Sequence, residues 1–191
     1  YETLRGEIEP IFREIADSQW FIMGPKVASF EAAVAAYCGT KHAVGCASGS
    51  DAVLLALMAH EIGPGDEVIC PSYTFFATAG SIHRLGAKPV FVDIDPVDYN
   101  LCPRHLEEVV ASCTNLKAIM PVHLFGQAAD LDAIETIAQR AGVPVLEDAA
   151  QAIGCRDTHG TVVGSRGSIG CFSFFPSKNL GAFGDGGIVT T

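Results

Sequence analysis

The feature that most constrains the fold is an alternation of strand-like and helix-like segments between His42 and Glu147. The strand candidates are short and rich in valine and isoleucine, and they lie at 43–47, 67–70, 89–93, 117–122 and 144–147. Helix candidates separate them at 51–61, 74–85, 103–112 and 131–141. Apolar strands that alternate with helices are typical of a mostly parallel sheet flanked by helices. The sequence therefore predicts an α/β fold.

Two further helices are predicted before the alternation, at 4–15 and 29–37, where apolar residues recur at helical spacing. Ser29 is placed to cap the second of them. The apolar segment 20–25 lies between these helices. Core packing is one interpretation of that segment, and a lip over a cleft or a subunit contact is the other.

The alternation gives way to short strands and glycine-rich turns after Asp148, and the chain ends within a strand-like run at 188–191. No linker or internal repeat divides the sequence. We therefore expect one domain over 1–191, with its N-terminal helical segment, and a polypeptide that continues beyond these residues.

The composition excludes several classes of partner. The net charge is −10 and no run of lysine or arginine occurs, which argues against nucleic acid or an anionic membrane as the partner. The seven cysteines occur singly, without the paired spacing of zinc or redox motifs, so we expect a reduced, cytoplasmic protein. No signal-peptide pattern and no membrane-spanning apolar run is present.

Ligands of open parallel sheets bind beyond the carboxyl ends of the strands, so polar residues at those ends are the site candidates. Ser50 and Asp51 lie where a strand meets a helix, and free N–H groups with the helix dipole make such a turn a phosphate cradle or an ordinary helix cap. Phe75 follows the next strand and is placed either to stack on a planar ring or to fill the core.

Two later strands also end in polar side chains. His123 follows one of them, where a structural role is slightly favoured over a catalytic one. Asp148 ends the other, with Gln151 three residues later. Because no convergent second ligand is evident, a metal site is disfavoured, and pairing of Asp148 with a cationic ring nitrogen is the alternative.

Lys178 lies between the apolar run 171–175 and a glycine-rich turn, with Ser173 five residues before it. Burial of a lysine lowers the pKa of its ammonium group and favours the neutral amine that attacks a carbonyl. A surface turn is the ordinary alternative for a lysine. Together, a phosphate cradle, an aromatic face, a carboxylate, an amide and a lysine are what pyridoxal phosphate requires.

Six motifs occur in order along the chain: Ser48-Gly-Ser-Asp-Ala, Gly63-Pro-Gly-Asp-Glu-Val, Gly86-Ala-Lys-Pro-Val-Phe-Val-Asp, Pro121-Val-His-Leu-Phe-Gly-Gln, Glu147-Asp-Ala-Ala-Gln and Phe172-Ser-Phe-Phe-Pro-Ser-Lys-Asn-Leu-Gly. Together they resemble the DegT/DnrJ/EryC1/StrS family of sugar aminotransferases. The resemblance covers nearly the whole chain, from about Ser18 to Thr191. It implies the large domain of a fold-type I pyridoxal-phosphate enzyme.

The resemblance also implies a role for each candidate residue. Lys178 would form the internal aldimine and shuttle the proton, Asp148 would pair with the pyridine nitrogen, and Gln151 would contact the ring hydroxyl. Phe75 would stack on the ring. The residues implied around the phosphate are Ser50, Asp51 and Ser173. No step follows for His123.

The implied reaction transfers an amino group from glutamate or glutamine to a nucleotide-linked keto sugar. The lysine at 178 favours transamination over dehydration, because related dehydratases carry histidine there, and the motif around it is closer to members that act on 3-keto sugars. Family members are usually homodimers with shared active sites. They also continue into a smaller C-terminal domain that these 191 residues lack.

Two other classes of protein remain as alternatives. A regulatory or ligand-sensing protein could use the same fold without catalysis, or the chain could be an inactive fragment. A nucleotide-binding oxidoreductase is disfavoured, because the glycines at 164, 167 and 170 have the wrong spacing and do not join an early strand to a helix.

Overall fold

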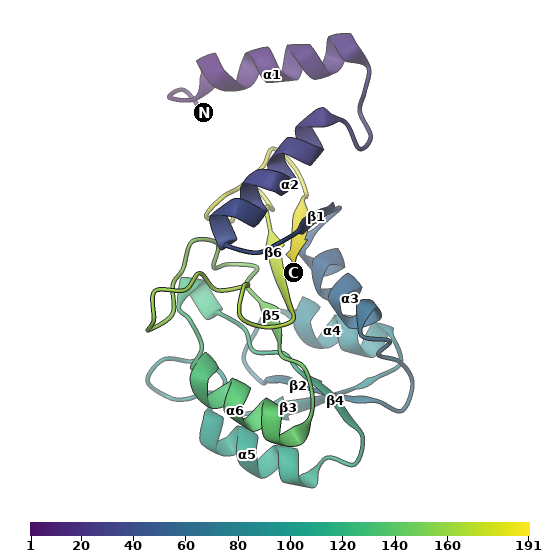
Figure 1. Cartoon of the computed structure of the whole chain (residues 1–191), viewed down its shortest axis with the longest axis vertical. Coiled ribbons are helices and arrows are strands. Elements are labelled where there is room, and N and C mark those ends of the chain that lie inside the picture. The colour runs from purple at the N-terminus through teal and green to yellow at the C-terminus, as the bar shows by residue number, and fades with distance from the viewer.

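The computed structural model describes residues 1–191 and places a central sheet between helices (Figure 1). The strands are β1 (Ala43–Cys46), β2 (Glu67–Pro71), β3 (Lys88–Val92), β4 (Leu116–Ile119), β5 (Leu146–Asp148), β6 (Ile169–Ser173) and β7 (Gly187–Thr190). The α-helices are α1 (Arg5–Ser18), α2 (Pro25–Cys38), α3 (Gly49–Ala59), α4 (Phe76–Arg84), α5 (Pro103–Ser112) and α6 (Leu131–Ala141). A short 3-10 helix, η1 (Leu124–Gly126), follows β4.

The strands form two hydrogen-bonded groups, ordered β3-β2-β4 and β1-β7-β6-β5. Isolated parallel bridges, Ile119 to Val145 and Val122 to Asp148, connect the two groups beside β4 and β5. The pairs β2–β3, β2–β4 and β5–β6 are parallel, whereas β7 runs antiparallel to both of its neighbours, β6 and β1. The expected mostly parallel sheet is confirmed, with β7 as its reversed strand.

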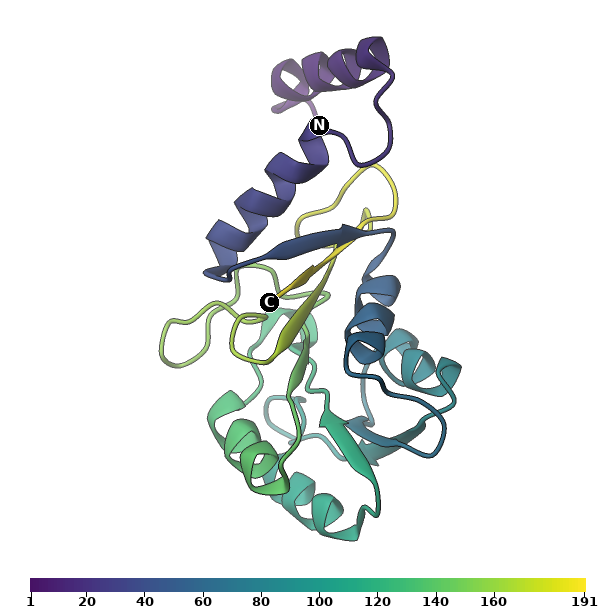
Figure 2. The same ribbon diagram turned by 45° about the vertical axis from the view of Figure 1, so that its right-hand side comes forward.

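Helices cover both faces of the sheet, as the two views show (Figures 1 and 2). Val68 of β2 packs in one core cluster with Leu57 of α3 and Ile82 of α4. The next residue, Ile69, belongs to the opposite cluster with Ile134 of α6. All of these side chains are fully buried, because successive residues of a strand face opposite sides of a sheet that is covered twice.

The start of α2 corrects a sequence expectation. The helix begins at Pro25, four residues before the predicted cap, with Gly24 as its N-cap residue. Proline is favoured in the first turn because its missing N–H would have no helical partner there. Ser29 therefore lies within the helix, and its hydroxyl donates to the Lys26 carbonyl at 3.0 Å.

The N-terminal segment packs sparsely. α1 has no buried residue, and its contacts with the rest of the chain include an edge-to-face pair of Phe12 with Phe183, at 5.3 Å between ring centroids. The apolar segment that follows is also exposed, with Phe21 at 69% and Ile22 at 81%. Core packing within this chain is therefore the wrong interpretation of segment 20–25. None of the helices has the length and apolar character needed to cross a membrane.

Candidate functional site

A cavity of about 610 Å³ lies at the carboxyl edge of the sheet. Its wall includes residues from the β1–α3 turn, the β2–α4 loop, η1, the end of β5 and the loop after β6. Six of the seven residues that the sequence proposed to bind the cofactor line it: Ser50, Phe75, Asp148, Gln151, Ser173 and Lys178. The seventh, Asp51, does not.

Asp148 is the buried acid of this cavity, at 5% exposure. β5 carries it to the sheet edge, and backbone hydrogen bonds hold it there: its N–H donates to the Pro121 carbonyl at 2.9 Å, and its carbonyl accepts from the His123 N–H at 3.0 Å. Thr78 Oγ1 donates to Oδ2 at 2.8 Å, and the Ala150 N–H donates to Oδ1 at 3.2 Å. Both carboxyl oxygens are therefore fixed, and each retains a lone pair.

Burial raises the pKa of Asp148 above that of an ordinary aspartate, because desolvation disfavours the charged form. The hydrogen bonds from Thr78 and Ala150 and the charge of Lys178 act in the opposite direction. A cation placed beside this carboxyl would therefore be strongly attracted to it in a poorly solvated setting.

Lys178 lies on the same cavity wall, in the loop after β6. Its side chain is half-buried rather than enclosed, and its backbone N–H donates to the Phe175 carbonyl at 2.8 Å. The Nζ atom makes no hydrogen bond or ion pair with the protein. A primary amine thus shares a cavity with a buried carboxyl and has no competing partner.

The two candidates at the start of α3, Ser50 and Asp51, have different surroundings. Ser48 caps the helix, since its Oγ accepts from the Asp51 N–H and donates to Asp51 Oδ2, both at 3.1 Å. Asp51 thus completes the cap, whereas Ser50 lines the cavity. A side chain at Gly49 would lie 2.5 Å from Cβ of Ser173, so glycine is what lets β6 bring Ser173 beside the helix N-terminus.

Phe75 and Gln151 occupy other parts of the wall. Phe75 precedes α4 with extended backbone angles and is 70% exposed, so it is not a core residue. The Oε1 atom of Gln151 accepts from the Phe125 N–H at 3.2 Å. Because that backbone group can only donate, the Gln151 amide nitrogen remains available as a donor.

His123 and Glu147 form a fully buried pair next to the cavity, joined at 2.9 Å through Nε2 and Oε2. Nδ1 of His123 accepts from the Ala129 N–H at 3.1 Å, so it carries no proton, and Nε2 donates to Glu147. Glu147 also accepts from the backbone N–H groups of residues 164, 166 and 167. The geometry gives His123 the structural role that the sequence slightly favoured.

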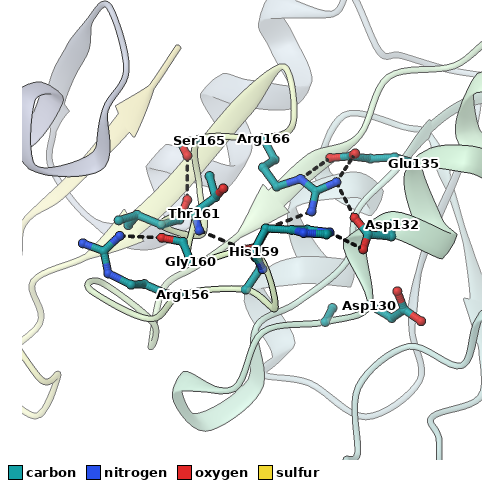
Figure 3. A network of polar contacts seen from close by, with 12 residues as sticks. Asp130, Asp132, Glu135, Arg156, His159, Gly160, Thr161, Ser165 and Arg166 are labelled. Atoms are coloured by element: carbon teal, nitrogen blue, oxygen red, sulfur yellow. Dashed lines mark hydrogen bonds and ion pairs between the residues drawn. The ribbon is translucent and has the colours of Figure 1, made fainter.

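The segment after Glu147 is tied to α6 by a polar network (Figure 3). Arg166 Nη2 lies 2.8 Å from Asp132 Oδ1, and its Nε donates to Glu135 at 3.1 Å. Its Nη1 donates to Asp157 at 2.8 Å, and His159 Nε2 lies 2.7 Å from Asp132 Oδ2. One guanidinium thereby anchors a glycine-rich loop whose backbone also binds Glu147.

Several residues of the site are absent from the sequence candidates. Thr78 bonds Asp148, while Phe125 and Asp185 line the cavity. Phe125 has φ +53°, which is uncommon for a bulky residue, and the adjoining Gly126 has φ +85°. Thr74 lies before α4 and Thr78 within it, so no helical pattern indicates the bond of Thr78 to Asp148, and no local pattern indicates Asp185.

Comparison with known proteins gives related sequences over the whole chain. A pleiotropic regulatory protein from Geobacillus stearothermophilus is 55% identical over 191 residues, which are 100% of this chain and 50% of that protein. UDP-N-acetyl-3-dehydro-alpha-D-glucosamine 3-aminotransferase from Acidithiobacillus ferrooxidans is 52% identical over 100% of this chain and 51% of its own length. The chain thus spans about half the length of these relatives.

Solved structures agree on the fold. The crystal structure of DesV from S. venezuelae matches 100% of this chain and 51% of its own with a TM-score of 0.96 and 46% identity. NtdA from Bacillus subtilis, determined with bound PMP, matches 94% of this chain and 40% of its own with a TM-score of 0.86 and 35% identity. The fold is that of the N-terminal half of fold-type I aminotransferases. The family model for DegT/DnrJ/EryC1/StrS aminotransferases matches residues 2–191, and the chain belongs to that family.

Proposed function

We propose that the full-length protein is a pyridoxal-phosphate-dependent aminotransferase that moves an amino group from glutamate or glutamine to a nucleotide-linked keto sugar. The observation that carries the proposal is the shared cavity of Lys178 and Asp148, an unpartnered amine and a buried carboxyl. Membership of the aminotransferase family supports it.

The residues of the cavity fit the cofactor. The buried Asp148 suits a protonated pyridine nitrogen, the free amide nitrogen of Gln151 suits the ring hydroxyl, and the exposed face of Phe75 suits the ring. The hydroxyls of Ser50 and Ser173 beside the α3 N-terminus suit the phosphate. Asp51, which completes the cap of that helix, is proposed to act at the phosphate through the helix start.

When bound, the cofactor supplies an aldehyde for amines and an electron sink for the substrate's α-carbon. The chain's own residues do the rest. Lys178 would hold the cofactor through Nζ, and the same atom would accept and return a proton. Asp148 stays ionised against its desolvation through the hydrogen bonds of Thr78 and Ala150, and so keeps its partner nitrogen protonated.

A 3-keto sugar is the proposed acceptor. The relative from Acidithiobacillus ferrooxidans is named for amination at position 3 of a UDP sugar. The Phe172–Lys178 motif favours the same group of enzymes. Glutamate or glutamine is the proposed donor.

The proposed assembly is a homodimer in which residues 1–191 form the large domain and a smaller C-terminal domain completes each chain. The exposed apolar side chains of α1 and the following segment support it, since a second copy would bury them: Leu4, Phe12, Trp20, Phe21, Ile22 and Met23. Such an arrangement allows active sites that are shared between subunits.

The test is to incubate the full-length protein with pyridoxal phosphate, reduce it with borohydride and map the modified peptide. We expect the label on Lys178 alone, and amino transfer to a nucleotide 3-keto sugar with glutamate or glutamine. Lys88 is the matched control: it pairs with Glu67 at 2.9 Å, so Lys88→Arg should label like the wild type, whereas Lys178→Arg should not. A label elsewhere, or none, overturns the proposal.

A regulatory protein that senses a ligand in this cavity is the second candidate. The 55% identical relative named as a pleiotropic regulatory protein favours it. An aminotransferase would transfer amino groups repeatedly to its substrate, whereas a sensor would not. Cofactor on Lys178 without amino transfer to any of a panel of nucleotide keto sugars would favour the sensor.

A further inference from the structure

The buried hydroxyl of Thr78 has an unusual partner for a helical threonine. Threonine side chains within helices commonly bond a carbonyl of their own preceding turn. Thr78 Oγ1 instead donates to Asp148 Oδ2 at 2.8 Å, across 70 positions of sequence. Thr78 is fully buried, so a valine of the same shape would fit its surroundings and lose only the hydrogen bonds of the hydroxyl.

A second hydroxyl extends the contact to the cavity wall. Thr74 and Thr78 lie 3.0 Å apart through their Oγ1 atoms. A hydroxyl has one proton, and that of Thr78 is given to Asp148. Thr74 must therefore donate to Thr78, and the direction of the chain is Thr74 to Thr78 to Asp148.

We propose that Thr78 is a positioning residue that holds the Asp148 carboxyl ionised and correctly oriented for the cofactor's ring nitrogen, with Thr74 as the outer member of the relay. This inference rests on the proposed function. Donors on both carboxyl oxygens, Thr78 on Oδ2 and the Ala150 N–H on Oδ1, fix the rotation of the group. Hydrogen bonds to the charged form favour ionisation.

The electrostatic setting of Asp148 shows why a dedicated donor is needed. Burial raises the pKa of Asp148, and Thr78 provides the largest opposing effect. The other titratable groups around it are Lys178 and His123, and the thiols of Cys70 and Cys171, whose pKa values burial and the charge of Asp148 raise. Lys178 is the group that the cofactor would occupy, so Thr78 is a support that remains when the site is loaded.

The first arm of the test needs no cofactor. Thermal unfolding of the full-length apoprotein is compared for wild type, Thr78→Val and Thr78→Ser from about pH 4 to about pH 8. An aspartate whose folded pKa lies above its unfolded pKa costs nothing below the unfolded value and costs most above the folded value. Thr78→Val raises the folded pKa further, so its loss in unfolding temperature should grow as pH rises.

Three comparisons make the readout specific. Thr78→Ser keeps the hydroxyl and should show wild-type pH dependence. When Asp148→Asn is already present, the loss in unfolding temperature caused by Thr78→Val should no longer depend on pH. Thr74→Val removes only the outer hydroxyl, and it should cause a smaller loss in unfolding temperature that also grows as pH rises. This variant keeps the inference testable if Thr78→Val does not fold.

The second arm measures pyridoxal phosphate binding and the pH dependence of the bound cofactor's absorbance. Thr78→Val should weaken binding roughly tenfold or more, and Thr78→Ser should not. A loss in unfolding temperature that is equal at every pH and additive with Asp148→Asn overturns the inference while the proposed function stands. Absence of cofactor on Lys178 in wild type overturns the function, and the first arm still decides whether Thr78 controls Asp148.

Discussion

The sheet body and the N-terminal segment differ in how many of their side chains find partners within the chain. In the body, every buried side-chain nitrogen and oxygen has a hydrogen-bond partner, including those of Glu147 and Asp148. In the segment from α1 to Met23, large apolar side chains are exposed and α1 buries no residue. The body thus satisfies its buried polar groups around a packed apolar core, whereas the N-terminal segment leaves most of its large apolar side chains exposed.

Glu147 lies in the body, and its substitution is expected to have the largest effect on the free energy of unfolding. Glu147→Gln places an amide N–H₂ against backbone N–H groups and should lower the free energy of unfolding by about 3–5 kcal/mol near neutral pH. Urea denaturation of the full-length protein measures it. Glu107→Gln, which removes an exposed pair with Arg140, is the control and should cost no more than about 1 kcal/mol.

The same variant has a defined pH dependence. Burial alone would raise the pKa of Glu147, but hydrogen bonds from His123, Gly167 and Gly164 lower it overall. Its contribution is therefore full above the ordinary glutamate pKa of about 4.5 and disappears as pH falls through the lower folded value. The difference between wild type and Glu147→Gln should shrink on acidification, and a difference that grows would contradict the assignment.

A smaller effect is expected at Arg166, which ties the loop around Glu147 to α6. Arg166→Met leaves the carboxylates of Asp132, Glu135 and Asp157 without their shared guanidinium. We expect a loss of about 1–3 kcal/mol in unfolding free energy and faster hydrogen exchange in the 156–168 loop. Arg140→Met, which removes an exposed arginine of α6, is the control, and an equal loss there would show that the Arg166 network adds nothing.

The smallest effect on folding is expected at Ile22, which is 81% exposed. Ile22→Ser should change the unfolding free energy of the dissociated chain by less than about 0.5 kcal/mol. In the proposed dimer it should raise the dissociation constant more than about tenfold, as measured by sedimentation. Ile82→Ser, at a fully buried position, is the control and should unfold the body. An unchanged dissociation constant for Ile22→Ser would place the segment outside the interface.

Much of the architecture could be predicted because it follows from local pattern. The strand and helix candidates between His42 and Glu147 are all present, with ends shifted by a few residues where backbone conformation decides. α4, for example, starts at Phe76 because Phe75 has extended backbone angles. Ser29 failed as a cap because a proline four residues earlier is a stronger helix start.

The sequence by itself determined the alternation of strands and helices, and thus that Asp148 and its neighbours at strand ends share one edge. That follows because parallel strands have their carboxyl ends at the same side of the sheet. Tertiary structure alone decided that Thr78 bonds Asp148, that Asp51 serves the cap rather than the cavity, and that segment 20–25 is exposed. Such choices depend on which side chains meet after packing, and no periodicity along the chain encodes a contact across 70 residues.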